Sequence, residues 1–254
     1  MKGVKSRISL IFSGVILAVL LTAWTIPASA QVNFLLNKFE YIENHPNQLV
    51  QNFDAGKVDP GQFELCDQPV DEFSDDNCFD PGDIFPGLAF VTSPFNVVPL
   101  FVAGENFFGG ANPNKALARS GGPGTFEVLF EGGVTSAGMD IGCFAEGGNC
   151  NSLQTVRLID ANGVTIDSIQ VKTDDFFSTF VGFDSTIPVT RVNISGPENL
   201  SQGVDEVRFG QRASNIPTLS EWGMIAAAAG LGLIAVFFAV RQRLRASKQS
   251  DAIG

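Results

Sequence analysis

Carboxylates offer the most specific chemistry in this sequence, because hard cations collect carboxylate and carbonyl oxygens. Asp205 precedes the apolar residues Val207 and Phe209 by two and four positions. Residues at this spacing share one face of a strand, so we expect Asp205 at the core or its rim, where a carboxylate needs a partner. A turn cap, or a pairing with arginine, is the favoured interpretation. Calcium is the alternative partner, with Glu40 from the first strand as a second ligand.

A second set of carboxylates occupies residues 71–83, but it lacks the twelve-position spacing of an EF-hand calcium loop. Prolines and two cysteines surround it, so the stretch 53–87 is typical of an acidic, cysteine-clipped surface insertion. A solvated loop is therefore favoured over a cation site. The set comprises Asp71, Glu72, Asp75, Asp76, Asp80 and Asp83.

Catalytic motifs are missing from the sequence. It has neither a GxSxG elbow nor an HExxH helix, and its single histidine, His45, stands in a turn beside Pro46. A lone histidine without an oriented partner makes a poor base, so we expect no enzyme. Sugar-binding surfaces commonly stack Trp or Tyr rings, yet Trp24 and Trp222 both lie in terminal apolar segments. A glycan would therefore be recognised through polar loops and calcium.

Four cysteines permit three disulfide connectivities, and an oxidising compartment would let them pair. Their close spacings favour Cys66 with Cys78 and Cys143 with Cys150, each clipping a loop. Zinc is the alternative, but no CxxC occurs, and structural zinc sites use tighter ligand spacings.

Short β-strands are the elements that must position these groups. Phe126, Val128 and Phe130 alternate with polar residues, and Asn162-Gly163 between two alternating runs predicts a hairpin. Apolar residues between Gln31 and Asn52 predict a first strand. Because no convincing 3.6-residue period occurs outside two membrane-type segments, we predict an all-β fold, an antiparallel jelly-roll-like β-sandwich over residues 31–212.

Residues 1–30 have the three parts of a secretory signal peptide. Basic residues precede an apolar run that ends near Ala23, and Ala28-Ser29-Ala30 supplies a small-residue cleavage site. Export through the Sec machinery is therefore expected. Residues 31–240 carry 9 basic and 26 acidic residues, a net charge of −17. Such a field repels nucleic acid, so nucleic-acid binding is disfavoured.

The C-terminal region, residues 213–254, combines an apolar helix with a basic end. Residues 222–240 are uncharged, and a helix of this length spans about 28 Å, near the roughly 30 Å hydrocarbon core of a membrane. Arg241, Arg243 and Arg245 follow as a cytoplasmic stop signal. Composition alone predicts a single-pass anchor that leaves the preceding chain outside the cytoplasm.

The residues before that helix resemble the IPTL-CTERM sorting signal, a relative of PEP-CTERM. Ile216, Pro217, Thr218 and Leu219 form the tetrapeptide, and Ser220-Glu221 leads to Trp222 and Gly223. The resemblance covers about the last 40 residues. It implies that an exosortase, a membrane-embedded enzyme, removes the tail and passes the protein to the cell envelope or the exterior.

A second resemblance lies in the last strands. Val181–Ser185, Ile187–Val192 and Val204–Gly210 are similar to the ending of galactose-binding-like and concanavalin-like β-sandwiches that often precede exosortase tails. The two resemblances imply an exported, non-catalytic envelope or matrix protein whose sandwich serves surface or matrix interaction, with extracellular polysaccharide as a partner. A calcium-dependent glycan-binding module is the alternative, and a glycoside hydrolase is the third hypothesis.

Overall fold

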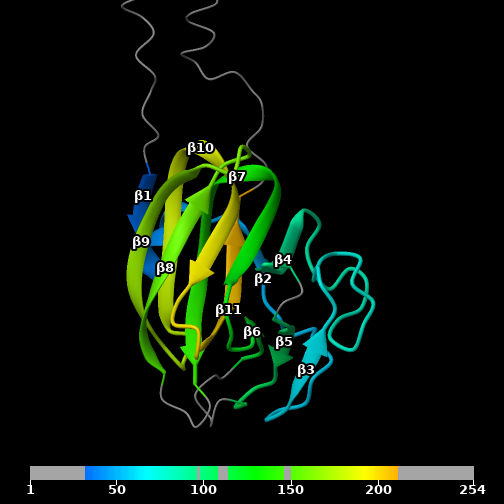
Figure 1. Ribbon diagram of the computed structural model, residues 1–254. Coiled ribbons are helices and arrows are strands. Elements are labelled where there is room, and N and C mark those ends of the chain that lie inside the picture. The colour runs from blue at the N-terminus through cyan, green and yellow to red at the C-terminus, as the bar shows by residue number, and fades with distance from the viewer. Residues whose placement is uncertain (1–31, 96–97, 108–113, 146–149, 211–254) are drawn as a thin grey trace, which may run out of the picture. The chain divides into compact units, whose positions relative to one another are not determined.

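The computed structural model describes residues 32–95, 98–107, 114–145 and 150–210, all within the first compact unit of the chain, Met1–Ala213 (Figure 1). The predicted signal peptide, the sorting motif and the predicted membrane helix 222–240 lie outside the described residues. Among the residues that are described, no helix is long and apolar enough to cross a membrane.

The described residues form eleven strands and one short helix, and every pairing between these strands is antiparallel. The fold is therefore all-β, as predicted. In chain order the elements are β1 (Val32–Leu35), α2 (Lys38–Asn44), β2 (Leu49–Gln51), β3 (Phe63–Cys66), β4 (Leu88–Ser93), β5 (Leu100–Ala103), β6 (Ala116–Arg119), β7 (Thr125–Phe144), β8 (Asn151–Ile159), β9 (Thr165–Asp174), β10 (Thr179–Ser195) and β11 (Ser201–Phe209).

Two long strands, β7 and β10, run through both layers of the sandwich (Figure 1). The first half of β7 pairs with β4 and with the second half of β10, which continues into β8 and β9. We call this the β9 layer. The second half of β7 pairs with β11 and with the first half of β10, and the sheet extends through β6 and β5 to β3. We call this the β11 layer; β1 and β2 complete it.

Glycines let β7 turn from one layer into the other. Gly132 and Gly133 have φ angles of 76° and 75°, a region that favours residues without a side chain. A Cβ atom at Gly133 would also lie 2.9 Å from Cβ of Pro188 on β10. The pairing of β7 with β10 shifts register twice nearby, between Asp184 and Val189 and between Val189 and Arg191, and the second shift lies opposite Gly132 and Gly133. Both long strands therefore bend at the same level.

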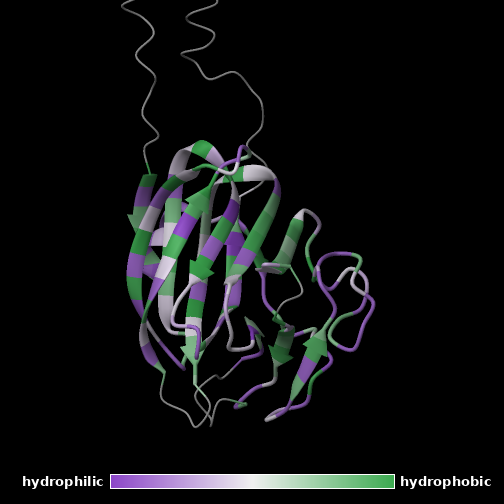
Figure 2. Ribbon diagram, in the orientation of Figure 1, coloured by the Kyte–Doolittle hydropathy of each residue, from purple (hydrophilic) through white to green (hydrophobic). Residues whose placement is uncertain are grey.

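The main core lies between the two layers. Phe126, Val128 and Phe130 face it from the first half of β7, which confirms the predicted alternation, and Met139 and Ile141 face it after the bend. Figure 2 shows the matching bands of apolar and polar residues along the strands. The bend changes whether even-numbered or odd-numbered residues of β7 face inward. This one strand therefore supplies side chains to the core from both layers.

The predicted hairpin between β8 and β9 is confirmed. Oδ1 of Asp160 accepts hydrogen bonds from the backbone amides of Asn162 and Val164, at 2.9 and 2.8 Å, and Gly163 has a φ of 77°. These contacts close the turn, as expected for Asn-Gly between two alternating runs.

Helix α2 replaces part of the predicted first strand, which ends at Leu35. The side chain of Asn37 caps the helix by accepting from the amides of Phe39 and Glu40, at 3.0 and 3.3 Å. The helix has seven residues, and only Tyr41 is buried. Two turns with a single buried residue produce no detectable 3.6-residue period, which explains why the sequence did not reveal the helix.

The insertion 53–87 contributes to the core as well as to the surface. Both predicted disulfides, Cys66–Cys78 and Cys143–Cys150, are confirmed, and the first closes a loop inside the insertion. Phe53 and Phe79 are fully buried, and the Phe53 ring meets Phe90 of β4 edge to face at 5.4 Å. Part of the stretch therefore packs against the sandwich, unlike the surface loop that its composition predicts.

Candidate functional site

Helix α2 covers part of the outer face of the β11 layer. Tyr41 lies on a floor of two paired glycines, Gly138 of β7 and Gly182 of β10. A Cβ atom at Gly182 would lie 2.5 Å from the Tyr41 ring, so only glycine admits the ring this closely. The ring also stacks on His45 at 4.4 Å and meets Phe180 at 5.2 Å. Helix α2 and the Tyr41 ring therefore cover this part of the outer face of the β11 layer.

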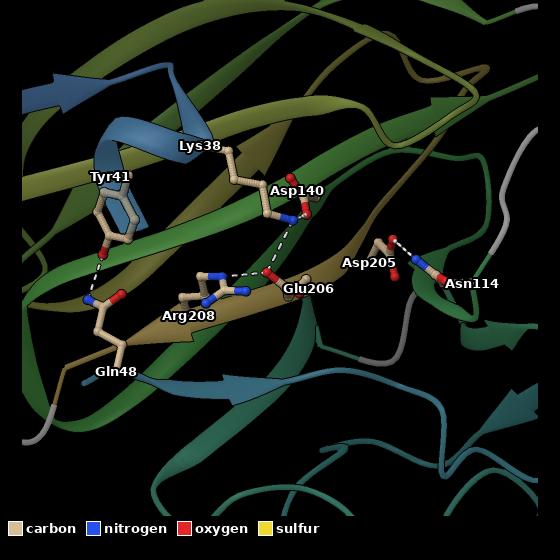
Figure 3. A network of polar contacts seen from close by, with 8 residues as sticks. All are labelled: Lys38, Tyr41, Gln48, Asn114, Asp140, Asp205, Glu206 and Arg208. Atoms are coloured by element: carbon tan, nitrogen blue, oxygen red, sulfur yellow. Dashed lines mark hydrogen bonds and ion pairs between the residues drawn. The ribbon is translucent and has the colours of Figure 1, made fainter. Parts of the chain in front are cut away.

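A β-bulge in β11 brings three carboxylates close together on this face, those of Asp140, Asp205 and Glu206 (Figure 3). Val204 pairs with Ile141 and Val207 with Met139, so Asp205 and Glu206 together oppose the single residue Asp140. The bulge breaks the strand parity from which the position of Asp205 was predicted. Val207 and Phe209 are buried, whereas Asp205 and Glu206 are half-buried.

Two basic side chains neutralise most of this cluster (Figure 3). Nζ of Lys38 lies 2.5 Å from Asp140 and 3.2 Å from Glu206, and Nε of Arg208 donates to Glu206 at 2.5 Å. Burial raises the pKa of Asp140, although Lys38 opposes this effect. Burial lowers the pKa of Lys38, but the hydrogen bonds and charges of Asp140 and Glu206 together outweigh it, and the pKa is raised overall. These ion pairs tie α2 to the sheet.

Asp205 has a different partner, Asn114, whose Nδ2 donates to it at 3.1 Å. Burial raises the pKa of Asp205 to about 6, the Asn114 bond lowers it, and the charges of Asp140 and Glu206 raise it further. Glu40 lies exposed on α2 rather than on a strand. Within the described residues, no group of three or more His, Cys, Asp or Glu is arranged to hold a metal ion. Calcium at Asp205 and Glu40 stays a prediction.

His45 has an acidic partner that the sequence did not reveal, because Asp184 lies 139 positions further along the chain. Its Nε2 lies 2.8 Å from Asp184, and its Nδ1 lies 2.9 Å from the carbonyl oxygen of Tyr41. A pocket of about 380 Å³ lined by Ser136 and Ser185 adjoins the pair. Both ring nitrogens are engaged by oxygens that accept hydrogen bonds, so neither is directed at a serine as a base would be.

The acidic residues of the insertion serve partly as backbone caps. Asp76 accepts from the amides of Cys78 and Phe79 through one oxygen, at 2.8 and 3.0 Å, and from the amide of Asp67 through the other, at 2.7 Å. Asp83 accepts from the amide of Asp80 at 2.8 Å. The Asp76–Cys78 contact is an Asx turn, and all of these bonds from side chain to backbone help to order the loop.

The same insertion forms one wall of a groove on the outer face of the β9 layer, which we call the Phe73 groove. Its volume is about 590 Å³. Residues 71–73 of the insertion line it together with residues of the sheet. Ala89 pairs with Leu129, which pairs in turn with Arg191, so three neighbouring strands contribute to this surface. The lining residues from the sheet include Leu88, Ala89, Leu129, Glu131, Thr190 and Arg191.

Phe73 is 77% exposed, and local contacts hold it there. Val70 forms a bridge to Phe90 of β4 through two backbone hydrogen bonds of 3.0 and 2.9 Å. Oδ1 of Asp71 then accepts from the amide of Phe73 at 2.9 Å. Because the Cys66–Cys78 disulfide also closes the loop around these residues, the backbone that carries the ring is anchored on both sides.

Arg191 supplies the positive charge of the groove. Its side chain is 43% exposed, and one terminal nitrogen lies 3.5 Å from Glu127, which is 6% exposed. Nδ2 of Asn193 donates to the same carboxylate at 3.0 Å. Glu127 therefore holds the guanidinium in place while part of it faces the groove. Neither Phe73 nor Arg191 was predicted as a site residue, since each resembles an ordinary loop or strand residue in the sequence.

No protein-family model and no curated protein sequence matches the chain. Among solved structures, TmCBM61 in complex with beta-1,4-galactotriose shows 12% identity and a TM-score of 0.29, over 50% of this chain and 89% of that one. The CBM22-1 xylan-binding domain of Xyn10C from Paenibacillus barcinonensis shows 13% and 0.29, over 63% and 92%. A DUF4465 family protein from Bacteroides caccae shows 10% and 0.31, over 69% and 98%. With TM-scores this low, none of these similarities identifies a binding residue.

Proposed function

We propose that this protein is an exported, non-catalytic β-sandwich that binds polysaccharide in the Phe73 groove. One observation carries the proposal: an aromatic ring that is 77% exposed stands over a groove that also contains carboxylates and a half-exposed arginine. The groove volume of about 590 Å³ falls within the usual range for ligand sites, roughly 300–1,000 Å³.

The groove offers the two kinds of contact that a sugar needs. The apolar face of a sugar ring can stack on Phe73, whose aromatic face is otherwise left in water. Sugar hydroxyls can donate to the carboxylates of Glu72 and Glu131 and can accept from the guanidinium of Arg191, and hydrogen bonds to charged groups are the stronger ones. An open groove on a sheet surface also suits a long, chain-like ligand better than a small ligand that would have to be enclosed.

The other outer face supports a structural role instead. Ion pairs there join Lys38 to Asp140 and Glu206, and Arg208 to Glu206. Tyr41 fills the space above Gly138 and Gly182. A ligand would have to break these pairs before it could bind. We therefore place recognition at the Phe73 groove.

Export and sorting form the second part of the proposal. A signal peptide over residues 1–30 would deliver the chain to the Sec machinery, and the tail 213–254 would present Ile216–Leu219 to an exosortase. The two disulfides support this route, because such bonds persist mainly in oxidising compartments. A tag placed after Lys248 should be lost from the mature protein in a host with the cognate exosortase. A full-length tagged product at steady state in that host would argue against processing.

Binding is tested by affinity electrophoresis and calorimetry against soluble polysaccharides, with the Phe73→Ala variant. We expect the loss of an interface anchor to weaken binding about tenfold or more. Phe39→Ala is the matched control, because Phe39 is 82% exposed but belongs to α2 on the other face. Equal affinities for the wild type and Phe73→Ala would reject the Phe73 groove as the site.

A further inference from the structure

We infer that the Phe73 groove prefers glycans that carry protonated amino groups over neutral glycans, and neutral glycans over those that carry carboxylates. This inference rests on the proposed function and names the ligand class of the same site. It follows from the balance of charges around Phe73.

Carboxylates outnumber cations in the groove. Asp71, Glu72 and Glu131 line it, and Arg191 is its one basic lining residue among those described. That guanidinium is already paired with Glu127, a carboxylate that is almost fully buried. The charge of Arg191 is therefore largely offset before a ligand arrives, and a net negative potential remains.

Glu72 is a carboxylate of the groove that a ligand can reach. Asp71 accepts from the amide of Phe73, whereas the Glu72 side chain makes no hydrogen bond or ion pair to another described residue. Glu72 also directly precedes Phe73 in the chain, and both residues line the groove. A protonated amine that stacks near Phe73 can contact the ring face and donate to Glu72, so the ring and the carboxylate favour the same charge.

Other sugars lack this combination. An N-acetylated sugar keeps the stacking surface but carries no charge, so it should bind more weakly. A uronic acid places a carboxylate against the carboxylates of the groove, which repel it. The acidic surface of the protein as a whole adds to this repulsion at low salt.

Calorimetry of the full-length chain with three oligosaccharides of equal length tests the inference. The probes are oligomers of glucosamine, of N-acetylglucosamine and of galacturonic acid. We expect the glucosamine oligomer to bind roughly tenfold more tightly than its N-acetylated counterpart at low salt, with no measurable binding of the galacturonic acid oligomer. The preference should shrink as salt is added.

The variant Glu72→Gln should lose most of the preference and still bind the N-acetylated oligomer. Asp75→Asn is the matched control: it removes one charge from the same exposed loop, but Asp75 does not line the groove. An equal loss of preference in both variants would mean that the general field acts, and would overturn the inference. Binding of the neutral oligomer without any preference would overturn the inference alone, whereas no binding of any oligomer would overturn the proposed function as well.

Discussion

The outer face of the β11 layer and the outer face of the β9 layer both carry carboxylates, an arginine and an aromatic ring. Under α2, Tyr41 is fully buried, and Arg208 and Glu206 neutralise each other in an ion pair. In the Phe73 groove, the ring is 77% exposed and Glu72 has no partner among the described residues. The same types of side chain therefore stabilise the fold on one face and are available to bind a ligand on the other.

The largest expected effect is on stability, at the closed face. Tyr41→Ala removes a ring that packs on Gly138, Gly182 and Phe180, and it should lower the free energy of unfolding by about 3–5 kcal/mol. Urea denaturation measures the loss. Phe39→Ala on the same helix should change the free energy by less than about 0.5 kcal/mol. Similar losses for the two variants would mean that Tyr41 does not hold the helix.

The next largest effect is on both stability and ligand binding. Replacing Cys66 and Cys78 with serine opens the loop that contains residues 71–73, and it should lower the free energy of unfolding by about 2–4 kcal/mol. Polysaccharide affinity should fall as well, because the ring loses its fixed position. The paired replacement of Cys143 and Cys150 is the control, since that disulfide does not enclose the groove. Unchanged affinity without Cys66–Cys78 would show that the groove does not need the loop to be clipped.

The smallest effect concerns Asp205 and pH. Its pKa is raised from 3.8 to about 6 in the folded protein, so the folded state binds more protons than the unfolded state between these values. Stability should therefore fall as the pH rises through this window. Asp205→Asn should remove that slope and gain about 1–2 kcal/mol near neutral pH, a range reduced for partial exposure. Urea denaturation of both proteins across the window measures the difference.

The same variant tests the calcium prediction. An ion at Asp205 would stabilise the wild type by mass action, and a chelator would lower its thermal midpoint. The midpoint of Asp205→Asn would then not respond to the chelator. Equal midpoints of the wild type with and without chelator would count against a structural ion.

Local signals in the sequence predicted the regular parts of the fold. Alternation around Val128, the Asn162-Gly163 turn and the two cysteine spacings depend on neighbouring residues, and the structure confirms all of them. The sequence predicts short strands in general, whereas β10 is one long strand whose register shift between Asp184 and Val189 interrupts the alternation. A bulge leaves no mark in composition, so a bent strand resembles two strands with a turn between them.

The candidate sites depended on contacts between distant residues. His45 meets Asp184 from 139 positions away, and the bulge at Asp205 changed which of its neighbours share a face. Phe73 stands among acidic residues, where its sequence context gives no indication that its ring is held over a groove. The insertion and the strands meet only in the folded chain, and strand periodicity alone could not predict that surface.

Hydrogen–deuterium exchange with and without a bound oligosaccharide tests most directly which outer face recognises the ligand. We predict slower exchange on binding in peptides that cover residues 71–73 and 129–131, with no change over Lys38–Asn44. Protection confined to α2 and the β11 bulge, with residues 71–73 unaffected, would contradict this account.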